Sequence, residues 1–546
     1  MRGQMMNQPL LISGQIEFAA RHHAHVEVVS RTVDGGIART TWGEVANRAR
    51  KLANALTALG IRHGDRVATI AWNTHRHLEV YFAVSSMGAV LHTINPRLPL
   101  EQLRYIVDHA EDTALFFDTT FVKLAECLAE GRSTIRHFVA MTDAQNMPPQ
   151  SGVTGLLEYE AFIAGRSDAF DWPQLEENTA SSLCYTSGTI GHPKGVLYSH
   201  RSTVLHSYAI AMPDALNFSA RDAVLPVVPM FHVNAWGVPY AAAIVGAKVV
   251  LPGPKLDGAS LTELIERERV TCLLGVPTVW MGLLAYLREQ GKTLTTVTKV
   301  ACGGSAAPPS MVHAFEREHG VQMLHAWGMT EMSPLGTVSV PLPKHAALDE
   351  QSLLALKCKQ GRPIFGVDIR IVGADGAVLP HDGQSSGHLQ VRGNWIVDTY
   401  YKSGEGPAHT DGWFDTGDIA TIDEDSFVQI TDRAKDVIKS GGEWISSIAL
   451  ENAAMSHPSV ALAAAIGVPH PKWVERPLLL VVKAPGRDVT AEELKQFLET
   501  KVVKWWLPDA IEFLDALPIG ATGKVLKREL RARFVNRGQV TKSEER

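Results

Sequence analysis

The stretch YTSGTIGHPKGVLYSH, residues 185–200, concentrates groups that bind anions. Its glycines let the backbone take positive φ values and come close to a ligand, its hydroxyls donate hydrogen bonds, and its lysine supplies a mobile positive charge. Together these groups form a cradle suited to phosphate. They are Thr186, Ser187, Gly188, Thr189, Gly191 and Lys194.

A nucleotide-triphosphatase P-loop does not match this cradle. That motif needs GxxxxGK followed by Ser or Thr, whereas here Pro193 precedes the lysine and Gly195 follows it. A glycine-rich surface turn is the alternative, because two glycines alone are common in loops. The full string favours a phosphate site of another kind.

Two carboxylates stand in short polar motifs farther along the chain. HAWGMTEMS, residues 325–333, contains Glu331, and a hard carboxylate oxygen beside phosphates suits Mg²⁺. DGWFDTGDIA, residues 411–420, contains Asp418, whose two oxygens could accept hydrogen bonds from a cis-diol. Each residue could instead be a solvated loop charge or a turn former.

The elements that must position these motifs alternate between helix and strand patterns. Residues 42–61 have apolar side chains at helical spacing, Gly60 ends the helix, and residues 65–72 follow as a buried strand. Residues 261–277 and 311–328 repeat this order. The alternation predicts an α/β fold of parallel sheets covered by helices.

The predicted secondary-structure pattern changes twice after this region. Short strands with turn dipeptides predict a β-rich subdomain at about residues 360–431. A last segment has its own strands and helices and could form a small core. We therefore expect a large N-terminal domain, residues 1–433, and a small mobile α+β domain, residues 434–546.

Composition limits the classes of partner. A net charge of −6 over 546 residues gives no general attraction to nucleic acid or to anionic membranes. No apolar run approaches the ~18 residues of a membrane span, and the N-terminus lacks the apolar core of a signal peptide. The five cysteines form no CxxC pair, so we expect reduced thiols and a cytoplasmic protein.

Taken in order, the motifs resemble those of the adenylate-forming superfamily, which includes acyl-CoA synthetases, non-ribosomal adenylation domains and beetle luciferases. Its phosphate loop reads approximately [YF]TSGTTGxPKGV, and this chain departs from it at Ile190, which removes one hydroxyl. GGSAAP at 303–308, DRAKDVIKSGGEWIS at 432–446 and ATGKVLKREL at 521–530 resemble further signatures. The resemblance covers about residues 35–535.

The resemblance implies roles for individual residues. Mg²⁺ would bind at Thr186 and Glu331, and these two residues, His232 and the mobile Lys524 would be catalytic. Lys524 could otherwise be an ordinary solvated lysine. Lys435 would be the hinge between domains. Besides the phosphate cradle, the residues expected to contact ATP are Gly304, Ser305, His325, Ala326, Trp327, Gly328, Thr330, Asp418, Arg433, Lys435, Lys439 and Lys524.

The resemblance also implies sites for the acid and for CoA. Amino-acid adenylation domains usually carry Asp directly after the Phe of this element, whereas here His232 follows Phe231, so an amino-acid substrate is disfavoured. Trp236 would be a gate that moves when ATP binds, although it could be a core tryptophan. The acyl residues would be His232, Val233, Trp236, Gly303, Gly304 and Met332. The CoA residues would be Lys439, Ser440, Gly441, Gly442, Glu443 and Trp444.

The wording FHVNAW, GVPTVW and HAWGMTEMSPLG is similar to the branch with 3-methylmercaptopropionate-CoA ligases and medium- and long-chain fatty acyl-CoA synthetases. We therefore expect an AMP-forming ligase that converts 3-methylthiopropionate or a small or medium-chain fatty acid to acyl-AMP, and then, with free CoA, to acyl-CoA. A long-chain acid, a carrier protein or water as acceptor, and a non-catalytic nucleotide-binding homologue remain alternatives. The sequence leaves a homodimer open.

Overall fold

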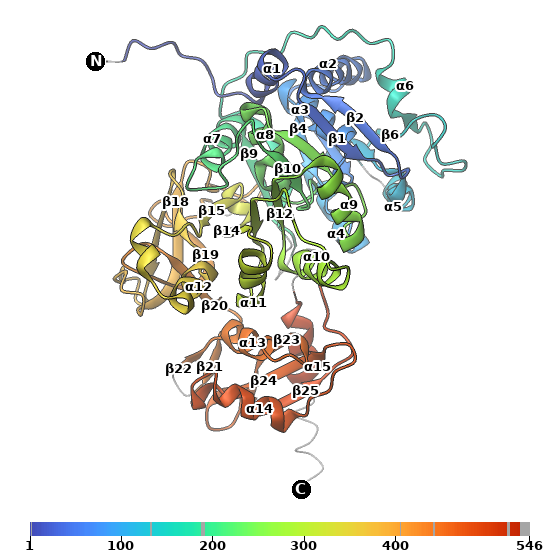
Figure 1. Cartoon of the computed structure of the whole chain (residues 1–546). Helices are drawn as coiled ribbons and strands as arrows, with labels where there is room; N and C mark the ends of the chain where they lie inside the picture. Colours follow the sequence, from blue (N-terminus) through green and yellow to red (C-terminus); the bar gives the residue numbers. More distant parts are fainter. Residues whose placement is uncertain are drawn as a thin grey trace.

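The computed structural model describes residues 1, 3–130, 134–186, 192–404, 406–440, 443–520 and 525–535. Within this part, two large sheets form the N-terminal region, a smaller antiparallel sheet lies beside them, and a separate C-terminal sheet lies below (Figure 1). The expected α/β class, with a β-rich part and a small α+β part at the C-terminus, is confirmed.

The first large sheet has nine strands and is parallel at its centre. Antiparallel strands occur only toward its two edges among the described pairings. Its strands run in the order β16 (Arg362–Pro363), β15 (Leu335–Val338), β14 (Gln322–Gly328), β13 (Lys299–Cys302), β12 (Cys272–Gly275), β10 (Ala223–Pro226), β11 (Lys248–Leu251), β1 (Glu27–Arg31) and β2 (Ile37–Thr41).

The second large sheet has seven strands, and its last pair, β8 and β9, is antiparallel and flanks the glycine-rich loop. Its order is β7 (Leu157–Glu158), β6 (His137–Ala140), β5 (Asp112–Phe117), β3 (Arg66–Ile70), β4 (Val90–Thr93), β8 (Ala180–Tyr185) and β9 (Gly195–Ser199). The loop therefore follows the penultimate strand of this sheet, β8, and leads into the edge strand, β9.

Helices cover both sheets and share one large core with them. Apolar side chains from β1, β3, β4, β10 and β12 belong to the same buried cluster as those from the helices around them. The helices of that cluster are α1 (Ile12–His22), α2 (Trp42–Leu59), α3 (His75–Ser86), α6 (Tyr159–Ile163), α7 (His200–Ala211) and α8 (Val238–Val245). The remaining helices of this region are α4 (Leu100–Ala110), α5 (Val122–Ala129), α9 (Gly258–Glu268), α10 (Pro277–Glu289), α11 (Pro309–His313) and α12 (Glu350–Cys358).

Helix α2 shows why these segments fold as expected. The Thr41 side chain accepts a hydrogen bond from the backbone N–H of Glu44, which satisfies one free donor of the first turn. Gly60 ends the helix with φ of 92°, a left-handed conformation that glycine adopts without a steric penalty. The expected helix and its end at Gly60 are confirmed.

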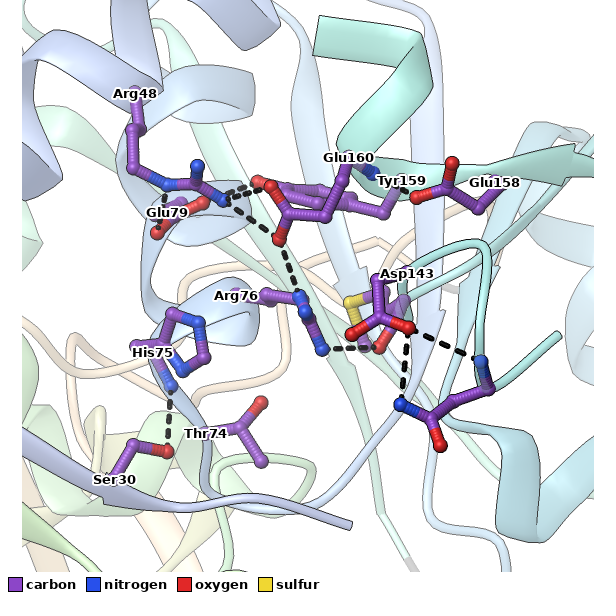
Figure 2. A network of polar contacts seen from close by, with 12 residues as sticks. Ser30, Arg48, Thr74, His75, Arg76, Glu79, Asp143, Glu158, Tyr159 and Glu160 are labelled. Atoms are coloured by element: carbon purple, nitrogen blue, oxygen red, sulfur yellow. Dashed lines mark hydrogen bonds and ion pairs between the residues drawn. The ribbon is translucent and has the colours of Figure 1, made fainter. Parts of the chain in front are cut away.

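A cluster of ion pairs, built around the buried Glu79, joins α2, α3 and α6 (Figure 2). The Glu79 carboxylate is fully buried; it lies 2.7 Å from Nε of Arg48 and accepts a 2.6 Å hydrogen bond from the Tyr159 hydroxyl. Glu160 lies 3.0 Å from Arg48 and 2.7 Å from Arg76. Each acidic group thus has a cationic partner on a different helix, which fixes the helices relative to one another.

The chain passes from the antiparallel sheet to the C-terminal sheet between Arg433 and Ile438. The antiparallel sheet consists of β17 (Val367–Val372), β18 (Ser386–Gly393), β19 (Phe414–Ile422) and β20 (Val428–Arg433). The C-terminal sheet consists of β22 (Glu443–Ile445), β21 (Ile438–Ser440), β24 (Val474–Lys483), β23 (Val460–His470) and β25 (Ala510–Phe513). Its helices are α13 (Ser447–Met455), α14 (Ala491–Glu499) and α15 (Lys527–Val535).

Among the described helices, none has the length and apolarity that a bilayer crossing requires. All five cysteines are free thiols, and Cys184, Cys272 and Cys302 are buried.

Candidate active site

The two ends of the glycine-rich loop are tied together by backbone contacts. The N–H of Thr186 donates to the carbonyl of Lys194 at 2.9 Å, and the N–H of Lys194 donates to Oγ1 of Thr186 at 3.2 Å. These bonds extend the β8–β9 pairing to the point where the loop begins. The expected residues Ser187, Gly188, Thr189, Ile190 and Gly191 lie outside the described residues.

Glu331 is linked to the lysine of the phosphate loop by Tyr400, an aromatic residue that the sequence motifs do not include. The Tyr400 hydroxyl donates a 2.9 Å hydrogen bond to Oε1 of Glu331, and the Lys194 ammonium lies 4.8 Å from the centre of the Tyr400 ring. Glu331 is only 8% exposed, and burial raises its pKa, while the hydrogen bond from Tyr400 opposes that rise. The desolvated carboxylate of Glu331 and the lysine of the loop therefore both contact Tyr400.

Asp418 occupies a junction between two sheets. It is 2% exposed, and its oxygens contact Nε of Arg433 at 2.7 Å and the indole N–H of Trp327 at 3.2 Å. Asp418 and Arg433 are cross-strand partners on β19 and β20, whereas Trp327 comes from β14. Asp418 thus joins two other residues that the resemblance assigns to the nucleotide, Arg433 and Trp327.

The other expected nucleotide residues lie near β14 and the loop after β13. Thr330 is buried, and its carbonyl accepts a 2.6 Å bond from the Tyr198 hydroxyl. Gly304 and Ser305 are exposed, and Ala326 is buried. At Gly328 a β-carbon would lie 2.0 Å from the carbonyl oxygen of Pro334, so only glycine fits.

His325 differs from the others in its side-chain partner. Its ring Nδ1 lies 2.8 Å from the carbonyl oxygen of Cys358, and burial lowers its pKa, so the neutral ring donates to that carbonyl. The imidazole of His325 is therefore buried and hydrogen-bonded within the protein.

The segment after Phe231 has an unusual backbone. Residues 233–236 have φ values of 48°, 49°, 49° and 58°, and Gly237 continues the left-handed run at 75°. A left-handed conformation costs roughly 1–2 kcal/mol per non-glycine residue, so four in succession need strong support from their surroundings. Strain of this size is typical of functional positions.

The left-handed run places Trp236 against the loop that follows β13. A β-carbon at Gly303 would lie 3.0 Å from Cη2 of Trp236 and 3.0 Å from the carbonyl oxygen of Ala326, so glycine permits this contact. Met332 is fully buried. His232, Val233 and Thr186 line one small cavity, which brings the acyl segment next to the start of the phosphate loop.

Four of the expected CoA residues, Lys439, Ser440, Glu443 and Trp444, lie on strands of the C-terminal sheet. Lys439 is exposed, and its N–H donates to a Glu475 carboxylate oxygen at 2.9 Å. Ser440 is buried, and its hydroxyl accepts a 3.2 Å bond from Arg476, so its side chain does not face a ligand. Gly441, Gly442 and Lys524, and the side chains of Glu443 and Trp444, lie outside the described residues.

Comparison with known proteins identifies the lineage of this site. Residues 16–401 match the family profile described as AMP-binding enzyme, and residues 449–524 match the AMP-binding enzyme C-terminal domain. The chain belongs to the AMP-binding enzyme family. The expected membership of the adenylate-forming superfamily is confirmed.

Relatives of this AMP-binding enzyme cover nearly its full length. The chain is 54% identical to the 3-methylmercaptopropionyl-CoA ligase of Ruegeria lacuscaerulensis, over 98% of this chain and 99% of the relative. It is 52% identical to the medium-chain-fatty-acid–CoA ligase of Ectopseudomonas oleovorans, over 98% of each chain. It is 47% identical to the long-chain-fatty-acid–CoA ligase of Thermus thermophilus, over 97% of each.

Solved structures share the fold of this AMP-binding enzyme. The anthranilate CoA ligase AuaEII, in complex with anthranoyl-AMP, has a TM-score of 0.86 at 23% identity and covers 98% of this chain and 99% of its own. MatB from Rhodopseudomonas palustris, bound to ATP, has a TM-score of 0.81 at 24% identity and covers 97% and 99%.

Sequence reasoning missed two residues in this AMP-binding enzyme. Tyr400 lies in an irregular segment that contains no motif, and its only sequence signal is an aromatic pair with Tyr401. Asn234 is inside the acyl motif but was not assigned a role there. The structural contacts that single out both residues are with partners distant in the sequence.

Proposed function

We propose that 3-methylthiopropionate or a fatty acid of small or medium length is the acid activated by this AMP-forming acyl-CoA ligase. The observation that supports the proposal most is the 54% identity, over 99% of its length, to a relative named 3-methylmercaptopropionyl-CoA ligase. The medium-chain relative follows at 52%, so the choice between the two acids rests on experiment.

In the first half-reaction, the acid carboxylate attacks the α-phosphorus of ATP; the acyl–phosphate bond forms and pyrophosphate leaves. Negative charge increases on the phosphoryl oxygens, so catalysis consists mainly of positioned cations and hydroxyls. Thr186 and Lys194, at the two ends of the loop, would hold the phosphates together with Ser187 and Thr189. Lys524 would add a mobile positive charge.

The nucleoside end of ATP would lie at the junction of Trp327, Asp418 and Arg433. One oxygen of Asp418 forms an ion pair with Arg433 and the other accepts a hydrogen bond from Trp327, which orients the carboxylate for the two ribose hydroxyls. The Trp327 indole would form a wall beside adenine.

Glu331 fits a magnesium ion that is held mainly by phosphates. Mg²⁺ commonly binds through one or two carboxylates together with substrate phosphates. Burial raises the pKa of Glu331, so a cation beside it would offset the cost of its charge. No group of three or more His, Cys, Asp or Glu side chains in the described part could form a protein-only cage. Bound there, Mg²⁺ would neutralise charge on the phosphates.

In the second half-reaction the CoA thiol attacks the acyl carbonyl, the thioester forms and AMP leaves. We infer that residues 434–546 move as one unit about Lys435, because the chain passes from one sheet to another between Arg433 and Ile438. This motion would withdraw Lys524 and present Lys439 and the following strand to CoA.

A pyrophosphate-release assay over propionate, 3-methylthiopropionate, octanoate and palmitate tests the proposal. The highest kcat/KM is expected for 3-methylthiopropionate or octanoate, with AMP release that requires CoA. Preference for palmitate would favour a long-chain ligase instead. AMP release without CoA would indicate water as acceptor, and no release with any acid would indicate a non-catalytic nucleotide-binding protein.

A further inference from the structure

We propose that Asn234 is a positioning residue for acid selectivity: its amide locks the left-handed turn that sets Trp236 against Gly303. The inference rests on the proposed function, since it concerns the acid site of that same ligase. It extends the function to a residue that contacts neither the nucleotide nor, on the geometry, the acid.

The Asn234 side chain is enclosed and fully engaged. It is 3% exposed, its Nδ2 donates to Oγ of Ser182 at 2.9 Å, and its Oδ1 accepts from Oγ1 of Thr93 at 3.3 Å. The hydroxyl of Tyr81 and the thiol of Cys184 add longer contacts to Oδ1, each at 3.5 Å. One short side chain therefore uses both its donor and its acceptor.

These partners belong to a different sheet from the strand that leads into the turn. Thr93 ends β4, and Ser182 and Cys184 lie on β8, both in the seven-stranded sheet, whereas the turn follows β10 of the nine-stranded sheet. Strand β8 continues directly into Thr186 and the phosphate loop. The amide of Asn234 thus links the turn at residues 233–236 to β8, the strand that leads into the phosphate loop.

The backbone at this point needs such support. The φ and ψ of Asn234 are 49° and 42°, and Ala235 has the same values. Asn is among the non-glycine residues that tolerate this conformation, but Val, Ala and Trp do not share that tolerance. The amide contacts therefore hold neighbouring residues, Trp236 included, in a conformation that they would otherwise leave.

The turn sets the position of the Trp236 indole, two residues after Asn234. Trp236 is half-buried, and its ring edge approaches Gly303 so closely that a β-carbon there would be 3.0 Å away. If the turn relaxed toward right-handed or extended backbone, the ring would leave Gly303. The acid pocket would then lose the wall formed by Trp236, while the residues of the nucleotide site would keep their positions.

The test is a double-mutant cycle on the full chain with Asn234→Ala, Trp236→Ala and the double variant. Asn234→Ala is expected to lower kcat/KM for the best acid by about tenfold or more, because several buried bonds are lost, and to change the ratio of kcat/KM among the four acids. KM for ATP should stay within about twofold. In the Trp236→Ala background, Asn234→Ala should change the acid ratios by no more than about twofold, since coupled residues are not additive.

Two further variants separate positioning from general destabilisation. Asn54→Ala removes an amide that donates to the carbonyls of Ser167 and Ala169 at 2.9 Å each, far from the turn, and should leave the acid ratios unchanged. Asn234→Gly keeps the ease of positive φ but removes the amide, and should behave like Asn234→Ala. If Asn234→Ala does not fold, Thr93→Val should shift the ratios in the same direction by a smaller factor, because it removes the hydroxyl that donates to Oδ1 of Asn234 and leaves the bond from Nδ2 to Ser182.

Parental acid ratios in Asn234→Gly, or an Asn234→Ala effect that persists unchanged without Trp236, would overturn the inference while the proposed function stands. A parental enzyme that releases no pyrophosphate with any of the four acids would overturn both.

Discussion

Tyr400 connects Glu331 to the phosphate loop: its hydroxyl donates to the Glu331 carboxylate at 2.9 Å, and its ring lies 4.8 Å from the ammonium of Lys194. A single phenol therefore contacts the expected magnesium ligand and the expected phosphate-binding lysine. Its hydrogen bond favours the ionised form of Glu331, which is the form that binds a metal ion.

Replacing Tyr400 with Phe should make metal use more sensitive to acid. Burial already raises the pKa of Glu331, and loss of the hydrogen bond raises it further, so the carboxylate becomes protonated at a higher pH. The acid limb of kcat/KM for ATP should therefore move to higher pH. KM for Mg²⁺ should rise by about tenfold, in line with a lost hydrogen bond to a charged group. Mg²⁺ titrations across pH measure both effects; an unchanged acid limb would show that Glu331 is not the titrating ligand.

Lys524→Ala should separate the two half-reactions. Loss of one positioned charge should slow acyl-AMP formation by about 10²–10³-fold, because that step develops negative charge on phosphate. Supplied with presynthesised acyl-AMP and CoA, the same variant should form thioester at close to the parental rate. Gly442→Leu should show the reverse pattern, because bulk there would obstruct CoA. Equal slowing of both steps by Lys524→Ala would contradict the alternating-domain mechanism.

Ile190→Thr should strengthen ATP binding. The family usually has a hydroxyl residue here, and one added neutral hydrogen bond is worth about 0.5–1.5 kcal/mol. KM for ATP should therefore fall by a few-fold to about tenfold. Initial rates at saturating acid and CoA measure it. A rise in KM would instead mean that Ile190 packs against its neighbours and that the loop of this chain has adapted to it.

Arg48→Met should destabilise the fold strongly. Glu79 is fully buried beside Arg48, and leaving it without its cation should cost about 3–5 kcal/mol of unfolding free energy. The double variant Arg48→Met/Glu79→Gln should recover part of that loss. Arg288→Met, which removes an exposed pair with Glu318, is the control and should cost about 0–1 kcal/mol. Urea titrations of the full chain compare them; equal losses would show that the cluster in Figure 2 adds no special stability.

The helix and strand order followed from the sequence because it depends on local periodicity and end signals. The helix that ends at Gly60 and the β-rich part after residue 360 are both found where expected. The antiparallel edges of the large sheets were not foreseen, since strand direction depends on pairings such as β14 with β15 rather than on residue pattern.

For the candidate site, too, some features followed from the sequence and others only from the structure. Thr186, Lys194, Glu331 and Asp418 could be selected from sequence because each lies in a contiguous motif whose residue types already state the chemistry. The proposed roles of these four residues still await experiment. What the structure adds is how their side chains are held.

By itself, then, the sequence determined the family, the fold class and the candidate residues for phosphate, metal and ribose, because short motifs encode them locally. Tertiary structure alone decided that Tyr400 contacts Glu331, 69 positions away in the sequence, and that Asn234 bonds Ser182 and Thr93, which are 52 and 141 positions away. It also decided the left-handed turn at residues 233–236. The tolerance of Asn for positive φ does not by itself account for four such residues in succession; we propose above that the hydrogen bonds between Asn234 and partners on another sheet offset the strain.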